Sequence, residues 1–359
     1  MSRAREFADL ASSADAGGLT GRNIIINGAM QVAQRATSVA SLSSTATYST
    51  CDRWQVQYGS SGTFTESQST TAPDGFSNSL KFDCTTADAS PNYLVLDQRI
   101  EGQNLQNLKK GTSSALSTTV SFYVRSSKTG TYQVNLRDLD NDRMIGATYA
   151  ISSANTWEFK SITFAGDTTG AFDNDNASSL SVEWWLAAGS TYNSGAVPTA
   201  WEATSNGDRA AGLNVAIGAS TSDDFHITGV QFEVGQKATP FEHRPFADEL
   251  RRCQRYYQKH GNETTAYRFL ASAFCNATTQ AQGVLTLPVT MRAAPSASVS
   301  GNFEMIHKNL NSSITLGTKQ LNPSSVGLEP SGSSFTQSSG AIIRGSNDAT
   351  AQLKLDAEL

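Results

Sequence analysis

Short segments in which apolar and polar residues alternate recur from Arg22 to about Thr239, and no other pattern limits the possible folds as strongly. Trp54, Val56 and Tyr58 form one such series, and side chains two residues apart share one face of a β-strand. Similar segments are 93–100, 119–125, 132–136, 157–164, 180–186 and 225–234; residues 23–28 resemble a buried strand that ends at an Asn-Gly turn. We therefore predict an all-β fold that begins with an antiparallel jelly-roll β-sandwich over residues 23–244.

The composition agrees with a β-rich fold. Only 16% of the residues are charged, while the chain contains 46 serines and 37 threonines. Long exposed helices need charged outer faces, so the composition disfavours coiled coils and helical repeats. The net charge of −5 argues against a nucleic-acid partner. No run of 18 apolar residues occurs, which argues against membrane insertion.

A helical pattern interrupts the alternation near residue 250. Apolar residues follow one another at intervals of four, three and four, namely Phe246, Leu250, Cys253 and Tyr257. We therefore predict a linker helix over residues 245–261. Its apolar side either packs on the chain's own sandwich or forms an oligomer interface with the same side of other copies. Alternation resumes afterwards and predicts a second, smaller β-sandwich domain over residues 262–359.

We predict that residues 1–22 form an N-terminal arm, which is either disordered or docks on a neighbouring protein. The first residues are charged and lack the apolar stretch of a secretory signal, so we expect synthesis in a reducing cytoplasm. In that compartment the four cysteines serve best as small buried hydrophobic residues.

Strand alternation also collects polar and aromatic side chains on one face, if the strands concerned share a sheet. Sugars need flat aromatic rings for their C–H faces and planar hydrogen-bonding groups for their hydroxyls. The candidate glycan-binding residues are Trp185, Tyr123, Glu183, Arg125, Arg137, Asn135, Gln133, Asp97 and Arg99. We expect Trp185 and Tyr123 to stack on the sugar. An ordinary solvated face, or one covered by a loop or a neighbouring subunit, is the alternative.

The sequence offers little for catalysis. It has four histidines, none with metal-ligand spacing, and no nucleophile or phosphate-binding motif. We expect a protein that is not an enzyme, with no catalytic residue, no metal and no cofactor. Asp97 and Glu183 lie on different strands and make a carboxylate pair conceivable, so a glycan depolymerase is the enzymatic alternative. The Asp/Asn clusters at 138–142 and 173–176 favour turns over calcium sites.

Two parts of the sequence resemble tailed-bacteriophage tail fibre and appendage proteins, including those of marine phages. One is Asn23-Ile24-Ile25-Ile26-Asn27-Gly28-Ala29-Met30-Gln31 with its continuation to Arg35. The more specific one is Ile227-Thr228-Gly229-Val230-Gln231-Phe232-Glu233-Val234-Gly235, followed by Ala238-Thr239-Pro240-Phe241-Glu242-His243-Arg244 and by Glu249-Leu250-Arg251-Arg252-Cys253. The resemblance covers residues 1–260 well and the last hundred only loosely.

The resemblance implies a jelly roll similar to carbohydrate-binding modules, on the outside of a virion. It implies a homo-oligomer, usually a trimer, that contacts other virion proteins through the N-terminal arm and host surface polysaccharide through the sandwich. A head fibre or capsid decoration protein with a purely structural role is the alternative. Many such jelly rolls carry an Asp for a structural calcium on the strand that corresponds to residues 225–230, and this chain lacks it.

Overall fold

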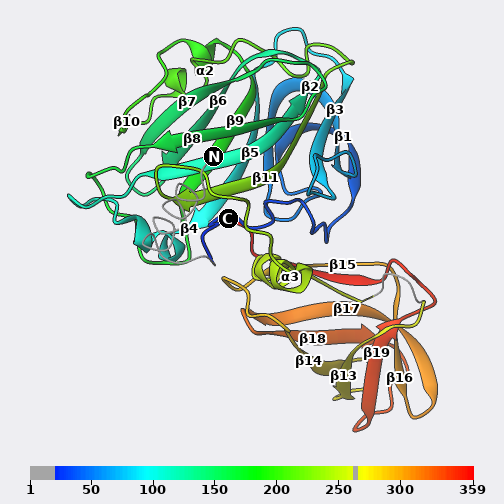
Figure 1. Ribbon diagram of the computed structural model, residues 1–359. Coiled ribbons are helices and arrows are strands. Elements are labelled where there is room, and N and C mark those ends of the chain that lie inside the picture. The colour runs from blue at the N-terminus through cyan, green and yellow to red at the C-terminus, as the bar shows by residue number, and fades with distance from the viewer. Residues whose placement is uncertain (1–20, 262–265) are drawn as a thin grey trace. The chain divides into compact units, whose positions relative to one another are not determined.

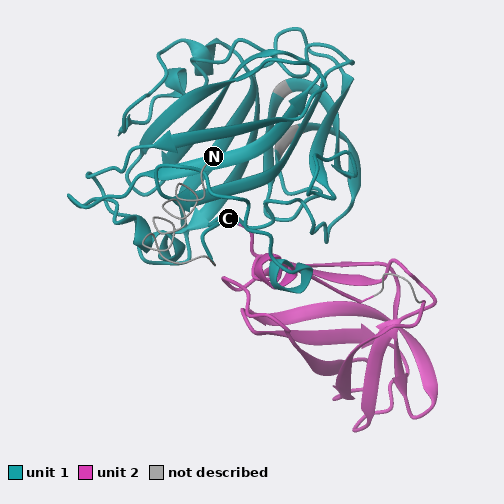
Figure 2. Cartoon of the chain, in the orientation of Figure 1, with its two compact units in different colours: residues 1–249, 359 teal, residues 250–358 magenta. Residues whose placement is uncertain are grey.

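The computed structural model describes residues 21–261 and 266–359, so the predicted arm lies almost wholly outside the described residues. The chain divides into two compact units (Figure 2): unit 1 holds residues 1–249 and 359, and unit 2 holds residues 250–358. Among the described residues, no helix is both long and apolar enough to cross a membrane.

Strands are the main regular elements of unit 1 (Figure 1). They are β1 (Ser38–Thr47), β2 (Gln55–Ser69), β3 (Ser79–Thr86), β4 (Tyr93–Glu101), β5 (Thr118–Ser126), β6 (Gly130–Asp138), β7 (Arg143–Ile151), β8 (Glu158–Phe164), β9 (Ser178–Ala188), β10 (Glu202–Ala203) and β11 (Asp224–Val234). The connections contain short helical turns, namely η1 (Gly102–Asn104), η2 (Gln106–Leu108), α2 (Ser190–Asn193) and η3 (Asn206–Asp208).

These strands form two layers because β2 passes from one to the other. Its first half, Gln55–Gly59, pairs with β4, and its second half, Thr63–Ser69, pairs with β3. The strand order is β10-β7-β6-β9-β4-β2-β3-β11-β5-β8, with β1 beside β2. We call β10, β7, β6, β9 and β4 the β9 layer, and β3, β11, β5 and β8 the β5 layer. The all-β prediction, a jelly-roll sandwich followed by a short helix and a second β domain, is confirmed.

The core lies between the two layers, where the predicted apolar faces meet. Trp184 of β9 contacts Phe122 of β5, with 5.7 Å between ring centroids, and Tyr132 of β6 contacts Phe225 of β11 at 5.8 Å. Trp54 also packs on Trp184. All five side chains are fully buried. Each large apolar side chain removed from water contributes about 1.5–3 kcal/mol, so these contacts hold the layers together.

Residues 23–28 are irregular, so the strand predicted there is wrong. The side chain of Asn23 bonds the backbone of Val230 and Phe232 on β11, which replaces part of a strand ladder. Gly28 approaches the same strand so closely that an added Cβ would lie 2.1 Å from the oxygen of Val230. The segment therefore follows β11 through these side-chain bonds, close packing and two backbone bonds, from Ile24 to Phe232 and from Val230 to Gly28.

The two motifs that resemble phage proteins, residues 23–35 and 227–253, contact each other, and the second holds the first in place. The carboxylate of Glu242 accepts hydrogen bonds from the backbone N–H groups of Gly21 and Asn23. The guanidinium of Arg244 donates to the carbonyls of Asn23 and Ile25 and lies 3.4 Å from the carboxylate of Glu249. The two motifs are 200 residues apart in sequence and form one contact in the fold.

Unit 2 closes into a barrel, where we expected a second sandwich. Its strands are β12 (Tyr257–Gly261), β13 (Phe269–Cys275), β14 (Ala281–Thr286), β15 (Ser296–Ser300), β16 (Phe303–His307), β17 (Leu310–Asn322), β18 (Ser325–Gly332), β19 (Gly340–Gly345) and β20 (Gln352–Asp356). In the described part of unit 2, β13-β14-β18-β17-β16-β19 form the closed barrel and β12-β20-β15 a separate sheet.

The helix α3 (Phe246–Gln254) is shorter than predicted, because Tyr257 begins β12. The predicted oligomer face does not form a single exposed stripe. Cys253 and Tyr257 are buried, Leu250 is half-buried, and Phe246 is 56% exposed. Two of the four side chains therefore pack inside the chain, which leaves Phe246 as the exposed member of the predicted interface.

Candidate functional site

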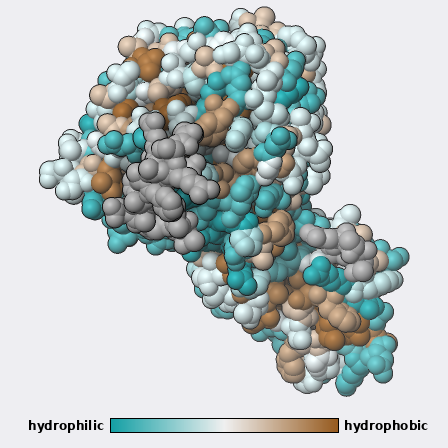
Figure 3. Space-filling view, in the orientation of Figure 1, coloured by the Kyte–Doolittle hydropathy of each residue, from teal (hydrophilic) through white to brown (hydrophobic). Residues whose placement is uncertain are grey.

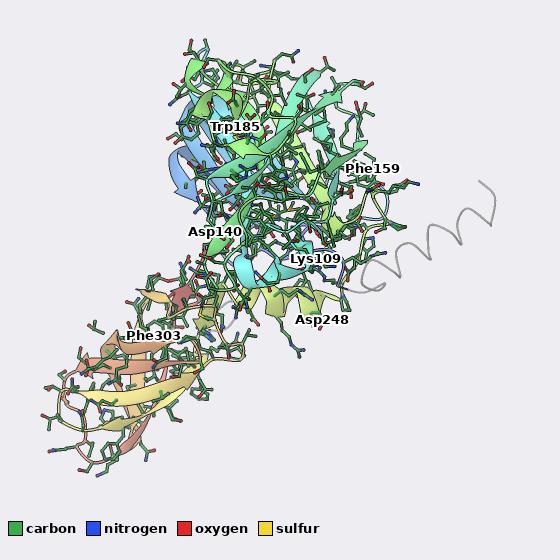
Figure 4. The ribbon with its side chains drawn as sticks, turned by 90° about the vertical axis from the view of Figure 1, so that its left-hand side faces the viewer. Lys109, Asp140, Phe159, Trp185, Asp248 and Phe303 are labelled. Carbon is green, nitrogen blue, oxygen red and sulfur yellow. The ribbon has the colours of Figure 1, made fainter. Side chains whose placement is uncertain are left out.

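The structure places the nine predicted glycan-binding residues on two opposite outer faces. Trp184 and Phe122 meet in the core, so their neighbours Trp185 and Tyr123 point away from it on different layers. Figure 4 labels Trp185 of the β9 layer and Phe159 of the β5 layer, which is the cross-strand partner of Tyr123. Tyr123 and Arg125 lie on the β5 layer, and the other seven residues lie on the β9 layer. The expectation that all nine form one face is wrong, and Trp185 and Tyr123 cannot stack on the same sugar in this fold.

On the β9 layer, the predicted polar side chains share one face and lie in cross-strand rows. Asp97 of β4 pairs with Glu183 of β9, and Glu183 pairs with Asn135 of β6. In the next row Trp185 pairs with Gln133. Alternation thus identified side chains that share this face, while their pairing follows from the topology. However, all five side chains are at most 1% exposed, so no sugar reaches them.

A segment of the chain itself, residues 189–214, covers this face. The side chain of Gln133 donates to the backbone oxygen of Asp208, and that of Asn135 donates to the backbone oxygen of Arg209. The guanidinium of Arg209 lies over the ring of Trp185, 4.9 Å from its centroid, and 3.0 Å from the carboxylate of Glu183. The ring of Tyr192 lies 5.7 Å from the same guanidinium and 5.1 Å from the ring of Trp185. On this layer, the structure therefore agrees with the alternative of a polar face that a loop of the chain covers.

The two carboxyl groups of this face differ in acidity. Burial raises the pKa of Asp97 to about 6, against the effect of Arg99 and helped by Glu183. For Glu183, burial favours a higher pKa, but the positive charges of Arg209 and Arg137 have the larger effect. The pKa of Glu183 therefore lies below its usual range. Arg99 and Arg137 remain about one-third exposed at the end of the face. The backbone oxygen of Leu359 accepts a hydrogen bond from Arg99 there.

The outer face of the β5 layer carries a group of partly exposed rings, which we call the aromatic patch: Tyr123, Phe159, Phe76, Phe241 and His243. Tyr123 of β5 and Phe159 of β8 are direct cross-strand partners, with ring centroids 5.1 Å apart. Phe76 lies 5.5 Å from Tyr123 and is 5.0 and 5.2 Å from Phe241 and His243. Phe159 is 50% exposed. Four separate chain segments thus bring rings to one surface.

Hydrogen-bonding groups border the aromatic patch. Arg125 donates to the side-chain oxygen of Asn155 and lies 3.5 Å from the carboxylate of Asp224. Gly229 makes room for the rings, since an added Cβ would lie 2.7 Å from Phe76 and its φ is +61°. The sequence contains one signal for the patch: Phe159 falls on the polar side of its alternating strand, which predicts an exposed ring.

The Asp/Asn clusters form turns and one internal ion network. Asp138 caps its own turn by accepting hydrogen bonds from the N–H groups of Asp140 and Asn141. The buried ammonium of Lys110 lies 2.5 Å from Asp138 and 3.2 Å from Asp167, and it also donates to the carbonyls of Thr169 and Gly170. A lysine therefore supplies the cation that these oxygens surround. Within the described ranges, no three His, Cys, Asp or Glu side chains gather in a way that could hold a metal.

The sequence matches no family model and no curated protein. Several solved structures have a distantly similar fold. One is the enzymatically active domain of tailspike protein 4 of bacteriophage CBA120, at 13% identity and TM-score 0.31; the match covers 59% of this chain and 21% of that one. Another is TmCBM61 in complex with β-1,4-galactotriose, at 10% identity and TM-score 0.29, covering 60% and 99%. A third is the CBM22-1 xylan-binding domain from Paenibacillus barcinonensis Xyn10C, at 10% identity and TM-score 0.25, covering 56% and 94%. Similarities this distant carry no argument about what this chain binds.

Proposed function

We propose that this protein is a non-catalytic virion appendage of the tail fibre or receptor-binding type, which contacts polysaccharide on the host surface. The observation that carries the glycan-binding part is the aromatic patch. Its rings are held in fixed positions by four chain segments and keep part of their surface in water. Exposed apolar groups of this kind on a folded protein mark interaction sites.

The chemistry of the aromatic patch suits a sugar. Aromatic rings bind the C–H faces of sugar rings, and the border supplies Arg125, Asn155 and Asp224 for hydroxyl groups. Rigid rings lose little conformational entropy on binding, because neighbouring rings already fix their rotamers. The patch therefore replaces the β9-layer face as the candidate glycan site. Tyr123 and Arg125 are the members retained from the sequence prediction.

The phage part of the proposal rests on the two resembling motifs. It includes assembly as a homo-oligomer, usually a trimer, and docking on other virion proteins through residues 1–22. Gly21 and Arg22, the end of that arm, bond to Glu242 and to the backbone oxygen of Pro240 in the second motif. The second motif thus binds the residues at which the arm joins the sandwich. We propose the virion as the final location, after synthesis in the host cytoplasm.

The proposal treats the protein as a non-enzyme. Asp97 and Glu183 oppose each other in register and differ in pKa, which is the pattern of an acid and base pair. Both are buried, and Glu183 lies beneath Arg209 and is engaged by Arg209 and Arg137. A glycosidase needs its carboxyl groups to reach the substrate. This arrangement supports a structural role better than the depolymerase alternative.

A glycan array with the intact protein tests the proposal. We expect binding, and we expect Phe159→Ala with Tyr123→Ala to weaken it at least about tenfold, or ~1.4 kcal/mol. Phe246→Ala is the matched control, because Phe246 is similarly exposed (56%) but lies outside the patch; this variant should bind normally. Absence of binding, with tight association to purified capsids, would favour the decoration alternative. Release of oligosaccharide would identify an enzyme.

A further inference from the structure

We infer that the aromatic patch selects a neutral polysaccharide in the form of separate chains, and not an acidic or a crystalline one. This inference rests on the proposed function. Two independent properties of the patch support it, the pairing of the charges around the rings and the angles between the rings.

The cations beside the rings are already engaged by carboxylates of the chain. Arg125 lies 3.5 Å from Asp224, and Lys81 of β3, in the same cross-strand row, lies 3.0 Å from Asp83. Arg244, which is almost fully buried, lies 3.8 Å from Glu242. An acidic sugar would have to compete with a carboxylate that is fixed at each cation.

The surrounding segments add no positive field. Counting the described residues of β3, the 70–78 loop, β5, β8, β11 and residues 235–244, five are lysines or arginines and six are aspartates or glutamates. His226 on β11 stays neutral at physiological pH, because burial lowers its pKa to about 4. Clefts that attract anions need an excess of positive charge. Glu233 is buried and Arg22 bonds to Pro240, so the charges of this surface nearly balance. A surface without a clear positive excess disfavours uronic, sialic or phosphorylated glycans.

The angles between the rings exclude a flat ligand surface. The planes of Tyr123 and Phe159 differ by 54°, those of Phe76 and Tyr123 by 56°, and those of Phe76 and Phe241 by 69°. A crystalline polysaccharide presents one plane of sugar faces, and only coplanar rings contact it together. Rings tilted by these angles fit a separate chain whose successive sugars turn relative to one another.

Affinity electrophoresis of the intact protein in galactomannan, dextran, alginate and hyaluronan, with pull-down on crystalline cellulose and chitin, tests the inference. We expect retardation by at least one neutral soluble polysaccharide, no retardation by the two acidic ones, and no sedimentation with the crystals. Binding should change less than twofold between 50 and 500 mM salt, in contrast to charge-driven binding. Preference for an acidic or a crystalline polymer, with loss in Phe159→Ala, would overturn the inference and leave the proposed function intact. No binding here or on the glycan array would overturn both.

A charge variant makes the test sharper. Asp83→Asn releases Lys81 from its carboxylate while keeping a hydrogen-bonding side chain of the same shape. We expect this variant to gain salt-sensitive retardation in alginate while its retardation in the neutral polymer persists. A variant that still ignores alginate would show that the pairing does not set the selectivity, which contradicts the inference.

Discussion

Glu66 shows how strongly one buried carboxyl group can tie stability to pH. It lies on β2, fully buried, and accepts hydrogen bonds from the backbone and hydroxyl groups of Thr50. Burial raises its pKa to about 7, and the hydrogen bonds from Thr50 and Tyr58 oppose that rise. Alternation could not predict that Glu66 is buried, because the pattern of β2 is irregular beyond Tyr58.

We expect Glu66 to make unit 1 less stable as the pH rises from about 4.5 to about 7. In this window the unfolded carboxyl group is ionised while the folded one keeps its proton, so folding binds a proton and weakens with rising pH. The rise from 4.5 to about 7 corresponds to at most about 3.4 kcal/mol. Asp97, raised from 3.8 to about 6, acts in the same direction between those two values.

Urea unfolding at several pH values checks this prediction, followed by tryptophan fluorescence. Trp54, Trp157, Trp184, Trp185 and Trp201 are the five tryptophans of the chain, and all lie in unit 1, so the signal reports that unit alone. Glu66→Gln keeps the shape of the side chain and removes its titration. The stability difference between this variant and the wild type should grow in favour of the variant above pH 4.5 and level off above pH 7. A difference independent of pH would contradict the assignment.

At the scale of elements, Lys110 joins the ends of strands from both layers. Asp138 ends β6 of the β9 layer, and Asp167 follows β8 of the β5 layer; the ammonium of Lys110 bridges the two. Arg143 of β7 binds Asp167 as well. Burial favours a higher pKa for Asp167, but the hydrogen bonds from Arg143, Thr169 and Lys110 have the larger effect. The pKa of Asp167 is therefore lowered.

We expect Lys110→Met to destabilise unit 1 by about 3–5 kcal/mol, because it leaves two buried carboxylates without their shared cation. Lys109→Met is the matched control. Its neighbour Lys109 is exposed, so that change should stay within about 0.5 kcal/mol. Urea unfolding followed by tryptophan fluorescence measures both. Equal, small effects would show that the network contributes little. Since a lysine fills the site, EDTA should leave the wild-type midpoint unchanged.

The sequence predicted elements better than their surroundings, for reasons that particular residues make clear. Alternation placed Trp184 in the core correctly, because the period of a strand depends only on local geometry. It could not show that residues 189–214 fold over Trp185, since that cover has no periodic signal. The helical spacing continued to Tyr257, but pairing with β20 overrode it. Tyr123 and Trp185 were predicted to share one face because alternation does not show which layer a strand joins. That depends on the topology of the whole sheet.

At the scale of the whole molecule, exposed apolar side chains are concentrated in the smaller unit. Among the described residues, nine large apolar side chains are strongly exposed, and seven of them belong to unit 2. These seven are Tyr267, Phe269, Phe274, Val284, Val299, Leu310 and Ile342. Figure 3 shows hydrophobic residues on the surface of unit 2 in brown. Such a density of exposed apolar groups on one unit indicates a surface that becomes covered.

Strand register brings several of these side chains together on β13, β14 and β19. Ile342 pairs with Ser272 on one side and with Ile306 on the other, while Phe274 pairs with Gly340 and Gln282. The small partners Ser272 and Gly340 would let another surface approach closely. These positions carry no charge, so two copies of the face meet without repulsion even though each chain has a net charge of −5. This barrel face is a better candidate for self-association than α3.

We expect the intact protein to form a homo-oligomer through this barrel face, and Phe274→Ser with Ile342→Ser to dissociate it. Each substitution removes exposed apolar area that association would bury, at about 25 cal/mol per Å². Phe246→Ser is the control for the helix, where Cys253 and Tyr257 are already buried in the chain. Light scattering coupled to size-exclusion chromatography should give the molar mass of one chain for the double variant and the mass of the oligomer for Phe246→Ser and the wild type. The reverse result would place the interface on α3, and a monomeric wild type would exclude both surfaces.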